Sequence, residues 1–452
     1  KKKKQQTPCA PSSGEAMTRL AALWGPSRAA IFWWLATTAQ AVPSGTSYDV
    51  PHVPHFTTAL AEAGPGEEPW RDDPGGGARL FGVDDDDDAA EAALEPPAPP
   101  KRHKRQCAPF PRIVIGCWQL FERHDDPERV LGFLEEYAEA NFTTFDAADL
   151  YDRAEQILGE FARRTEHDIT VFTKYVTQDS AKFLVEQINR RSRRSLGVGA
   201  LALVQFHWWA FNDHRYIQTA KHLHALEDDG RIAALGACNF DVKRLKRLLV
   251  DKRIPLVSNQ VQFSLLDRRP ENGLLQFAAD HGLSILCYGV VAGGFLSDRF
   301  RGMSYADVRA IRRADATVSL QTYRASLDAW SGGGEAGWAL FQDLLATLRA
   351  VADDLAETRR HPEEKRRRPN VATVAIAWVI DRLDATCGGS VVLGIRDATH
   401  LDDAVLARDL TLDQTHRDRI DAVLRRGRAP EGDVWSRERV GAPNYDSRGA
   451  HI

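Results

Sequence analysis

The chain has few cysteines, no long apolar run and little net charge, and each absence excludes a class of protein. Six cysteines among 452 residues are too few for a disulfide scaffold, and none has the spacing of metal ligands, so we expect no metal. No run of 18 apolar residues is present, so we expect no membrane insertion of the folded part. The formal net charge of −4 lacks the basic excess of a nucleic-acid-binding protein. The content of 43% hydrophobic and 27% charged residues is that of a folded enzyme.

The first 108 residues differ from the rest. After Met17, a short apolar segment over 29–39 precedes the small-residue pattern Ala39-Gln40-Ala41, which is the arrangement of a secretory-type signal peptide. The alternatives are an incorrectly assigned start and a tail without structure. Residues 42–108 contain a glycine triplet, five consecutive aspartates, a proline-rich stretch and a basic run, so we expect them to be disordered.

From residue 110 onward, short apolar runs alternate with amphipathic stretches. The eight strand candidates are 113–116, 143–146, 169–173, 201–206, 233–237, 256–260, 283–287 and 391–393. The helix candidates are 127–140, 153–164, 180–196, 216–229, 242–249, 271–281 and 372–383. Such alternation predicts an α/β fold with a parallel sheet, and eight units predict a (β/α)8 barrel over 109–430, followed by a tail over 431–452. A doubly wound sheet would also alternate, but no Gly-x-Gly-x-x-Gly turn follows any strand candidate.

Two segments exceed what a barrel needs. Residues 297–337 are polar and rich in glycine and arginine, and no pattern in them predicts regular structure; we expect a long loop over the end of the barrel. Residues 357–369 are a charged insert that we expect to be a solvated loop.

Polar residues follow the strand candidates, at the barrel end where chemistry takes place. Asp146 and Tyr151 follow the second, Lys174 the third and His207 the fourth. A tyrosine is a poor acid at neutral pH, and a neighbouring lysine would lower its pKa, while an aspartate would keep the buried lysine charged. A histidine beside them can orient a carbonyl or relay a proton. The four predict a proton donor for carbonyl reduction, although each alone could be an ion-pair partner or a packed core residue.

Further polar residues suit a flat, amide-bearing ligand. Asn239 follows the fifth strand candidate, Gln260 ends the sixth and Tyr288 follows the seventh. The two amides can hold a carboxamide, and the tyrosine offers an aromatic face for a flat ring.

Several segments resemble the aldo-keto reductase family. They are FDAADLYDRAEQILGEF (145–161), VFTKY (171–175), LVQFHWW (203–209), GACNFDVKRLKRL (236–248), VSNQVQFSLLDRRPE (257–271), LCYGVVAGGFLSDRF (286–300) and VVLGIRDATHLDDA (391–404). The resemblance covers residues 110 to 430 and looks closest to plant and algal members of uncertain substrate, some of which are plastid-targeted.

The resemblance implies a barrel that binds NADPH, or less often NADH, at its carboxyl face. Tyr151 would be the general acid, tuned by Lys174 and Asp146, and His207 would orient the substrate carbonyl. Asn239 and Gln260 would hold the nicotinamide carboxamide, over the ring of Tyr288.

The last segment would bind the cofactor phosphate and adenine. Gly394, Arg396, His400 and Asp403 match its positions, with Arg396 the candidate for the 2′-phosphate, so NADPH is favoured over NADH. The chain departs from many members at Cys238 and Gly289, where they have serine, and at Gly394, where some have lysine.

The sequence predicts an NADPH-dependent oxidoreductase that reduces a small aldehyde or ketone. The alternatives are a regulatory or sensor subunit that binds NADPH and turns over slowly, and a lyase that forms a Schiff base through Lys174. A signal followed by a disordered presequence is compatible with import into a plastid, whereas a nicotinamide-dependent reductase is also at home in the cytoplasm.

Overall fold

The structure is a computed structural model that describes residues 110–438, except 122–125, 152, 177–178, 312–317, 359–367, 387 and 396. The signal-like segment and the extension expected over residues 1–108 lie outside the described residues. So do Arg396 and most of the charged insert and of the expected tail.

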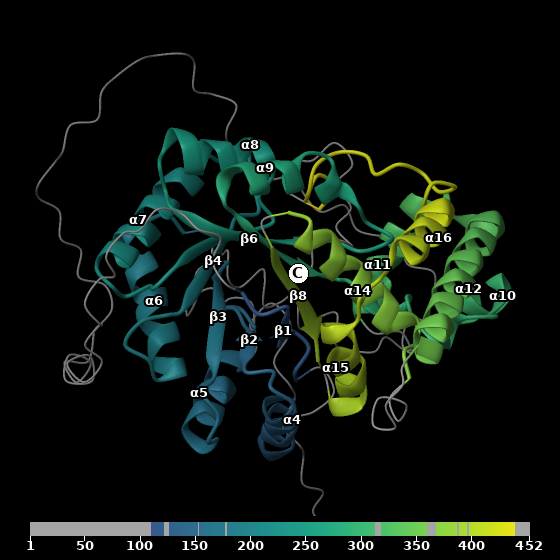
Figure 1. Ribbon diagram of the computed structural model, residues 1–452. Coiled ribbons are helices and arrows are strands. Elements are labelled where there is room, and N and C mark those ends of the chain that lie inside the picture. Colours follow the sequence, from purple (N-terminus) through teal and green to yellow (C-terminus); the bar gives the residue numbers. More distant parts are fainter. Residues whose placement is uncertain are drawn as a thin grey trace, which may run out of the picture. The chain divides into compact units, whose positions relative to one another are not determined.

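Eight parallel strands surround a common centre (Figure 1) and form a closed barrel in sequence order. Strand β1 pairs with β8, and Ile115 lies opposite Leu393. The strands are β1 (Ile113–Gly116), β2 (Thr144–Asp146), β3 (Thr170–Tyr175), β4 (Leu203–His207), β5 (Leu235–Cys238), β6 (Leu256–Gln262), β7 (Ser284–Tyr288) and β8 (Gly389–Gly394). The predicted (β/α)8 barrel is therefore confirmed, with every strand at a predicted position.

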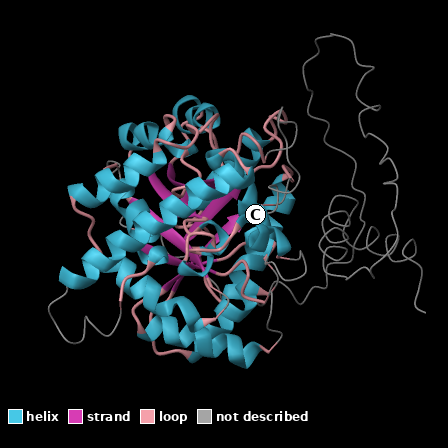
Figure 2. Cartoon of the chain, turned by 90° about the vertical axis from the view of Figure 1, so that its right-hand side faces the viewer, coloured by secondary structure: helices cyan, strands magenta, loops and turns pink. Residues whose placement is uncertain are grey.

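Helices surround the strands, as Figure 2 shows. They are α4 (Pro127–Glu139), α5 (Ala154–Arg164), α6 (Lys182–Leu196), α7 (Tyr216–Asp228), α8 (Val242–Lys246), α9 (Leu274–His281), α10 (Tyr305–Ala310), α11 (Val318–Ser331), α12 (Gly334–Thr358), α14 (Val371–Asp384), α15 (Leu401–Asp409) and α16 (Gln414–Leu424). The start of α4 shows how local chemistry sets a boundary: the Asp126 carboxylate accepts from the backbone N–H of Glu128, and Pro127 is the first helical residue. None of the described helices combines the length and apolar character needed to cross a bilayer.

The prediction of a long loop over 297–337 is wrong, because this segment contains α10 and α11. The buried apolar residues of α11 recur at helical spacing along one face. They are Leu320, Tyr323, Leu327 and Trp330. The sequence analysis did not recognise this apolar stripe because the segment around it is rich in arginine and glycine. Gly332 and Gly333 connect α11 to α12, both with the positive φ that glycine adopts at little cost.

Helix α11 packs against the carboxyl ends of three strands. The Ser319 hydroxyl donates to the Gln119 side chain (2.9 Å) beyond β1, and Gln262 at the end of β6 donates to Ser326 (2.8 Å). Beyond β7, a Cβ atom at Gly289 would lie 2.6 Å from the hydroxyl oxygen of Tyr323. Because serine would collide there, glycine at 289 allows α11 to approach the barrel end.

Candidate active site

A buried ion pair lies at the carboxyl end of β2 and β3. The ammonium of Lys174 contacts the carboxylate of Asp146 and donates to the backbone oxygen of Ala147 (3.0 Å). Both charged residues are at most 3% exposed. Lys174 lies inside β3 and not after it as predicted, since β3 extends two residues further. A buried pair of this kind is stable only when its remaining hydrogen-bonding capacity is met.

Two glutamines meet that requirement. Gln205 and Gln260 each donate to Asp146 Oδ1 (2.7 Å), and Gln260 also donates to Gln205 Oε1 (2.8 Å). The sequence analysis did not single out Gln205. A signal was present, because Gln205 precedes His207 by two residues on β4, so both side chains lie on the same face of the strand.

Tyr151 lies against the lysine of this pair. The Lys174 Nζ atom is 4.7 Å from the centre of the Tyr151 ring. Burial raises the pKa of Tyr151 above its usual value, and the opposing effect of the Lys174 charge is smaller. Lys174 lowers the pKa of Tyr151 as predicted, but burial outweighs this effect, so the net shift is upward. Burial by itself lowers the pKa of Lys174, but Asp146 and then Tyr151 raise it, so the lysine stays charged, as predicted.

His207 is the last residue of β4, is 1% exposed, and is uncharged. Burial lowers the pKa of His207 to about 3. Its Nδ1 atom lies 3.2 Å from the backbone oxygen of Cys238, which can only accept, so we assign the ring proton to Nδ1. The rings of Trp209 and Trp435 meet the imidazole edge-on, with ring centres 4.8 Å and 5.2 Å away.

Trp435 comes from the C-terminal segment, which the sequence analysis treated as a tail. A buried arginine holds this segment: Arg269, just after β6, pairs with Asp267 (2.6 Å) and with Glu438 (2.7 Å). Arg269 and Glu438 are 169 residues apart, and no sequence pattern predicts their contact.

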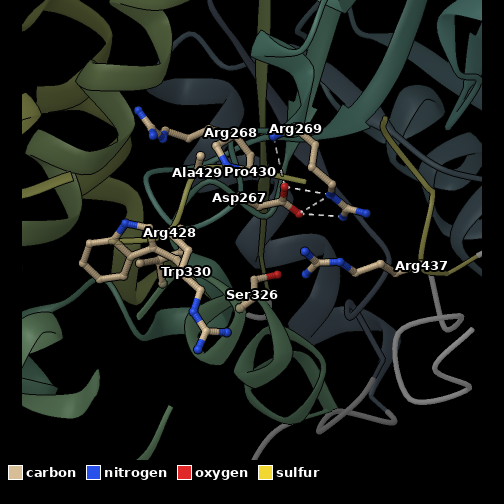
Figure 3. A pocket seen from close by; sticks show the side chains of 11 residues that line it. Asp267, Arg268, Arg269, Ser326, Trp330, Arg428, Ala429, Pro430 and Arg437 are labelled. Atoms are coloured by element: carbon tan, nitrogen blue, oxygen red, sulfur yellow. Dashed lines mark hydrogen bonds and ion pairs between the residues drawn. The ribbon is translucent and has the colours of Figure 1, made fainter. Parts of the chain in front are cut away.

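A cleft lies beside this ion pair, and Figure 3 shows the side chains that line it. It is bounded by the loop after β6, by α11 and by the C-terminal segment. The lining residues include Asp267, Arg268, Arg269, Ser326, Trp330, Arg428 and Arg437. Asp146, Tyr151, Lys174 and His207 do not line it, so this cleft is separate from the catalytic candidates.

The structure brings together the three residues expected around a nicotinamide. The hydroxyl of Tyr288, at the end of β7, donates to Asn239 Oδ1 (2.9 Å). Asn239 in turn places its Nδ2 atom 3.4 Å from His207 Nδ1. Gln260 lies across the site with its nitrogen directed to Asp146, while its Oε1 accepts from none of the described residues.

The residues expected around the cofactor phosphate follow β8. Gly394 ends the strand, and a Cβ atom placed there would meet no atom within 4 Å. His400 and Asp403 lie 3.3 Å apart, and Asp403 also accepts from Asn370 (2.5 Å). Arg396, the predicted phosphate ligand, lies outside the described residues.

A closed barrel with a charged lysine, a tyrosine and an uncharged histidine at its carboxyl end has the architecture of a barrel oxidoreductase. The chain belongs to the aldo/keto reductase family, whose model matches residues 112–425. This is a family of NAD(P)H-dependent oxidoreductases that act on carbonyl compounds.

Similar proteins have diverse names. The chain is 29% identical over 197 residues to a flagellar radial spoke protein 5 of Chlamydomonas reinhardtii, covering 40% of this chain and 33% of that protein. It is 28% identical over 108 residues to an NADH-specific methylglyoxal reductase of Escherichia coli (strain K12), covering 24% and 32%. The matches thus span about a third of each relative. A solved glycerol dehydrogenase of Gluconobacter oxydans shares the fold with a TM-score of 0.56 and 18% identity, covering 73% of this chain and 96% of that one.

Proposed function

We propose that this protein is an NADPH-dependent reductase of small aldehydes or ketones, with Tyr151 as the general acid. The observation that carries the proposal is the contact of the Lys174 ammonium with the Tyr151 ring, while Lys174 itself is held charged by buried Asp146. The bound nicotinamide would supply a hydride from its C4 atom to the carbonyl carbon. The protein residues then have to supply one proton to the carbonyl oxygen.

The environment of Tyr151 suits this proton transfer. Its raised pKa keeps the hydroxyl protonated until negative charge develops on the substrate oxygen. An alkoxide is a stronger base than a phenolate, so the proton then moves from the Tyr151 hydroxyl to the substrate oxygen. The phenolate that remains is stabilised by Lys174, whose charge Asp146 maintains in the low-dielectric interior. His207, uncharged and beside this pair, is proposed to position the substrate.

The amides fit a nicotinamide carboxamide, which presents one acceptor and one N–H2 group. Gln260 has an Oε1 acceptor for the N–H2 group, and Asn239, whose backbone N–H donates to the backbone oxygen of Gln260 (2.8 Å), has an Nδ2 donor for the carbonyl. The hydrogen bond from the Tyr288 hydroxyl to Asn239 fixes the Tyr288 ring beside Asn239, where the ring can stack against the nicotinamide.

The end of β8 fits a phosphate. The open space around Gly394 allows a close approach to the backbone, as phosphate binding requires. Arg396, His400 and Asp403 are proposed to bind the adenosine half, with Arg396 on the 2′-phosphate. Arg396 is the reason for proposing NADPH in place of NADH.

The first test is substitution of Tyr151 by Phe in the full chain. Turnover of a small aldehyde should fall by about 100-fold or more, since general acid catalysis contributes roughly 10²–10⁴-fold. The dissociation constant for NADPH, measured by tryptophan fluorescence, should change little. Tyr305→Phe, on the surface helix α10, is the matched control and should retain full turnover. Near-normal turnover in Tyr151→Phe would show that another group supplies the proton.

A second candidate function is a regulatory or structural subunit that binds NADPH and turns over slowly. The similarity to a radial spoke protein favours it, since the name of that relative denotes a part of an assembly. It predicts tight NADPH binding without turnover of any aldehyde. A Schiff-base lyase is disfavoured, because a nucleophilic lysine has to lose its proton and Lys174 is held charged.

A further inference from the structure

Three buried side chains from strands that are not neighbours form a closed ring of hydrogen bonds inside the barrel. They are Asp146 on β2, Gln205 on β4 and Gln260 on β6, each at most 2% exposed. Gln205 Nε2 and Gln260 Nε2 both donate to Asp146 Oδ1 (2.7 Å each), and Gln260 Nε2 also donates to Gln205 Oε1 (2.8 Å). Asp146 holds the lysine charged and Gln260 is expected at the cofactor, whereas the part that Gln205 plays in the reaction has not been assigned.

The arrangement of the strands lets Gln205 reach Gln260 across β5. Strand β5 lies between β4 and β6, and Gly236 on β5 is the register partner of Gln205. Register partners place their side chains on the same face of a sheet, so the position beside Gln205 on the side of β6 carries no side chain. A Cβ atom at Gly236 would lie 2.4 Å from Ser258 Oγ, so a larger residue does not fit there. The contact between the two glutamines therefore depends on a glycine in the strand between them.

The ring determines which end of each amide faces which neighbour. The Asp146 carboxylate only accepts hydrogen bonds when it is ionised, so both glutamines direct their Nε2 atoms at it. Gln205 then turns its Oε1 atom to Gln260, and the two hydrogens of Gln260 Nε2 meet two acceptors. If the Gln260 amide were turned over, its Oε1 atom would face two oxygen atoms with no hydrogen between them. The orientation of Gln260 is therefore fixed by Gln205 as well as by Asp146.

The bond to Gln205 adds what the bond to Asp146 alone does not supply. With one hydrogen bond, the plane of the Gln260 amide could pivot about that bond, and the second hydrogen of Nε2 would have no acceptor in the buried interior. The second bond fixes the plane of the amide, and with it the place of the Gln260 Oε1 atom. That place has to be precise, because a carboxamide N–H2 group must reach this oxygen while its carbonyl reaches Asn239 Nδ2.

We propose that Gln205 is a positioning residue for the cofactor, which fixes the Gln260 amide so that its Oε1 atom receives the N–H2 group of the nicotinamide carboxamide. The same side chain donates to Asp146, whose other oxygen contacts Lys174, so one glutamine links the cofactor contact to the ion pair beside Tyr151. Selectivity for a carboxamide on the cofactor ring is then a property of the three side chains together. This inference rests on the proposed binding of a nicotinamide cofactor.

The test compares NADPH with its 3-acetylpyridine analogue, which carries a methyl group in place of the N–H2 group and keeps the carbonyl. Both dissociation constants are measured with the full chain by tryptophan fluorescence. The wild-type protein should bind the analogue about fivefold or more weakly than NADPH, as expected for one lost hydrogen bond. Gln205→Met keeps the length of the side chain and removes both of its hydrogen bonds. It should bring the two dissociation constants to within about twofold of each other, by weakening the binding of NADPH and leaving that of the analogue nearly unchanged.

Two further variants separate positioning from packing. Gln205→Glu offers an acceptor oxygen to Gln260 Nε2 whether or not its carboxyl group is protonated, so the preference for NADPH should persist. Gln218→Met is the matched control: the Gln218 side chain lies on α7 and bonds to His222, so both dissociation constants should stay unchanged. Gln205→Leu takes the place of Gln205→Met in the comparison if the methionine variant does not fold.

A double-mutant cycle shows whether Gln205 acts through Gln260. Gln260→Met alone should remove the preference for NADPH, and adding Gln205→Met should then change the ratio of the two dissociation constants by less than about twofold. An equal weakening of both nucleotides in Gln205→Met, or a loss of preference in Gln205→Glu as large as in Gln205→Met, would overturn the inference. A wild-type protein that reduces an aldehyde but binds NADPH and the analogue equally would also overturn it and leave the reductase function standing. Binding of neither nucleotide would overturn both.

Discussion

Replacement of Lys174 by methionine leaves the Asp146 carboxylate buried without its cation. Removing one partner of a buried ion pair costs about 3–5 kcal/mol, because the other charge stays unpaired in a low-dielectric interior. Gln205 and Gln260 still donate to Asp146 Oδ1 at 2.7 Å and offset part of this loss. We therefore expect the free energy of unfolding to fall by about 3 kcal/mol, the lower end of that range.

The assay is guanidinium unfolding at neutral pH, with the full chain and its variants. Lys182→Met is the matched control: the Lys182 side chain is 67% exposed and its ammonium pairs with Glu186 at 3.6 Å, so the loss should stay below about 0.5 kcal/mol. Lys174→Met combined with Asp146→Asn should recover at least half of the lost stability, because the carboxamide is uncharged. Turnover should be abolished both in Lys174→Met and in the double variant. A loss in Lys174→Met no larger than in Lys182→Met would refute the reasoning.

Three further predictions concern the cofactor, pH and packing. Arg396→Ala should raise the dissociation constant of NADPH by about tenfold or more and that of NADH by less than twofold, since a charge-assisted bond to the 2′-phosphate is lost; equal weakening of both would place the phosphate elsewhere. His207 has a folded-state pKa of about 3, below the unfolded value near 6.5, so its contribution to stability is full above pH 6.5 and declines as the pH falls. The wild-type protein should lose about 2 kcal/mol more than His207→Gln between pH 7.5 and pH 5, and a constant difference in unfolding free energy would contradict the buried, uncharged histidine. Gly289→Ala places a Cβ 2.5 Å from the Tyr323 ring at a φ of +69°, so the free energy of unfolding should fall by about 2–4 kcal/mol. In the control Gly273→Ala, at a φ of +101° with no atom within 4 Å, it should fall by about 1 kcal/mol. Similar losses in the two variants would show that α11 does not pack on the loop after β7.

The barrel could be predicted from sequence because each strand is a short apolar run whose side chains are buried locally. Residues such as Asp146 and His207 stand at the ends of such runs, so their place at the carboxyl face follows from the topology of parallel strands. Gln205 could have been found in the same way, from its two-residue spacing to His207. Helix α11 could have been found from its apolar stripe, which the polar composition of the segment concealed.

The sequence by itself determined the eight-stranded barrel and the strand ends at which the polar candidates stand, because both depend on local periodicity. Tertiary structure decided three features that depend on contacts between distant residues. Burial, set by the whole barrel end, raises the pKa of Tyr151 although Lys174 opposes it. Packing on Gly289 positions α11 over the strands. The ion pair between Arg269 and Glu438, 169 residues apart, holds Trp435 against His207, and no local pattern encodes a contact that only the folded chain creates.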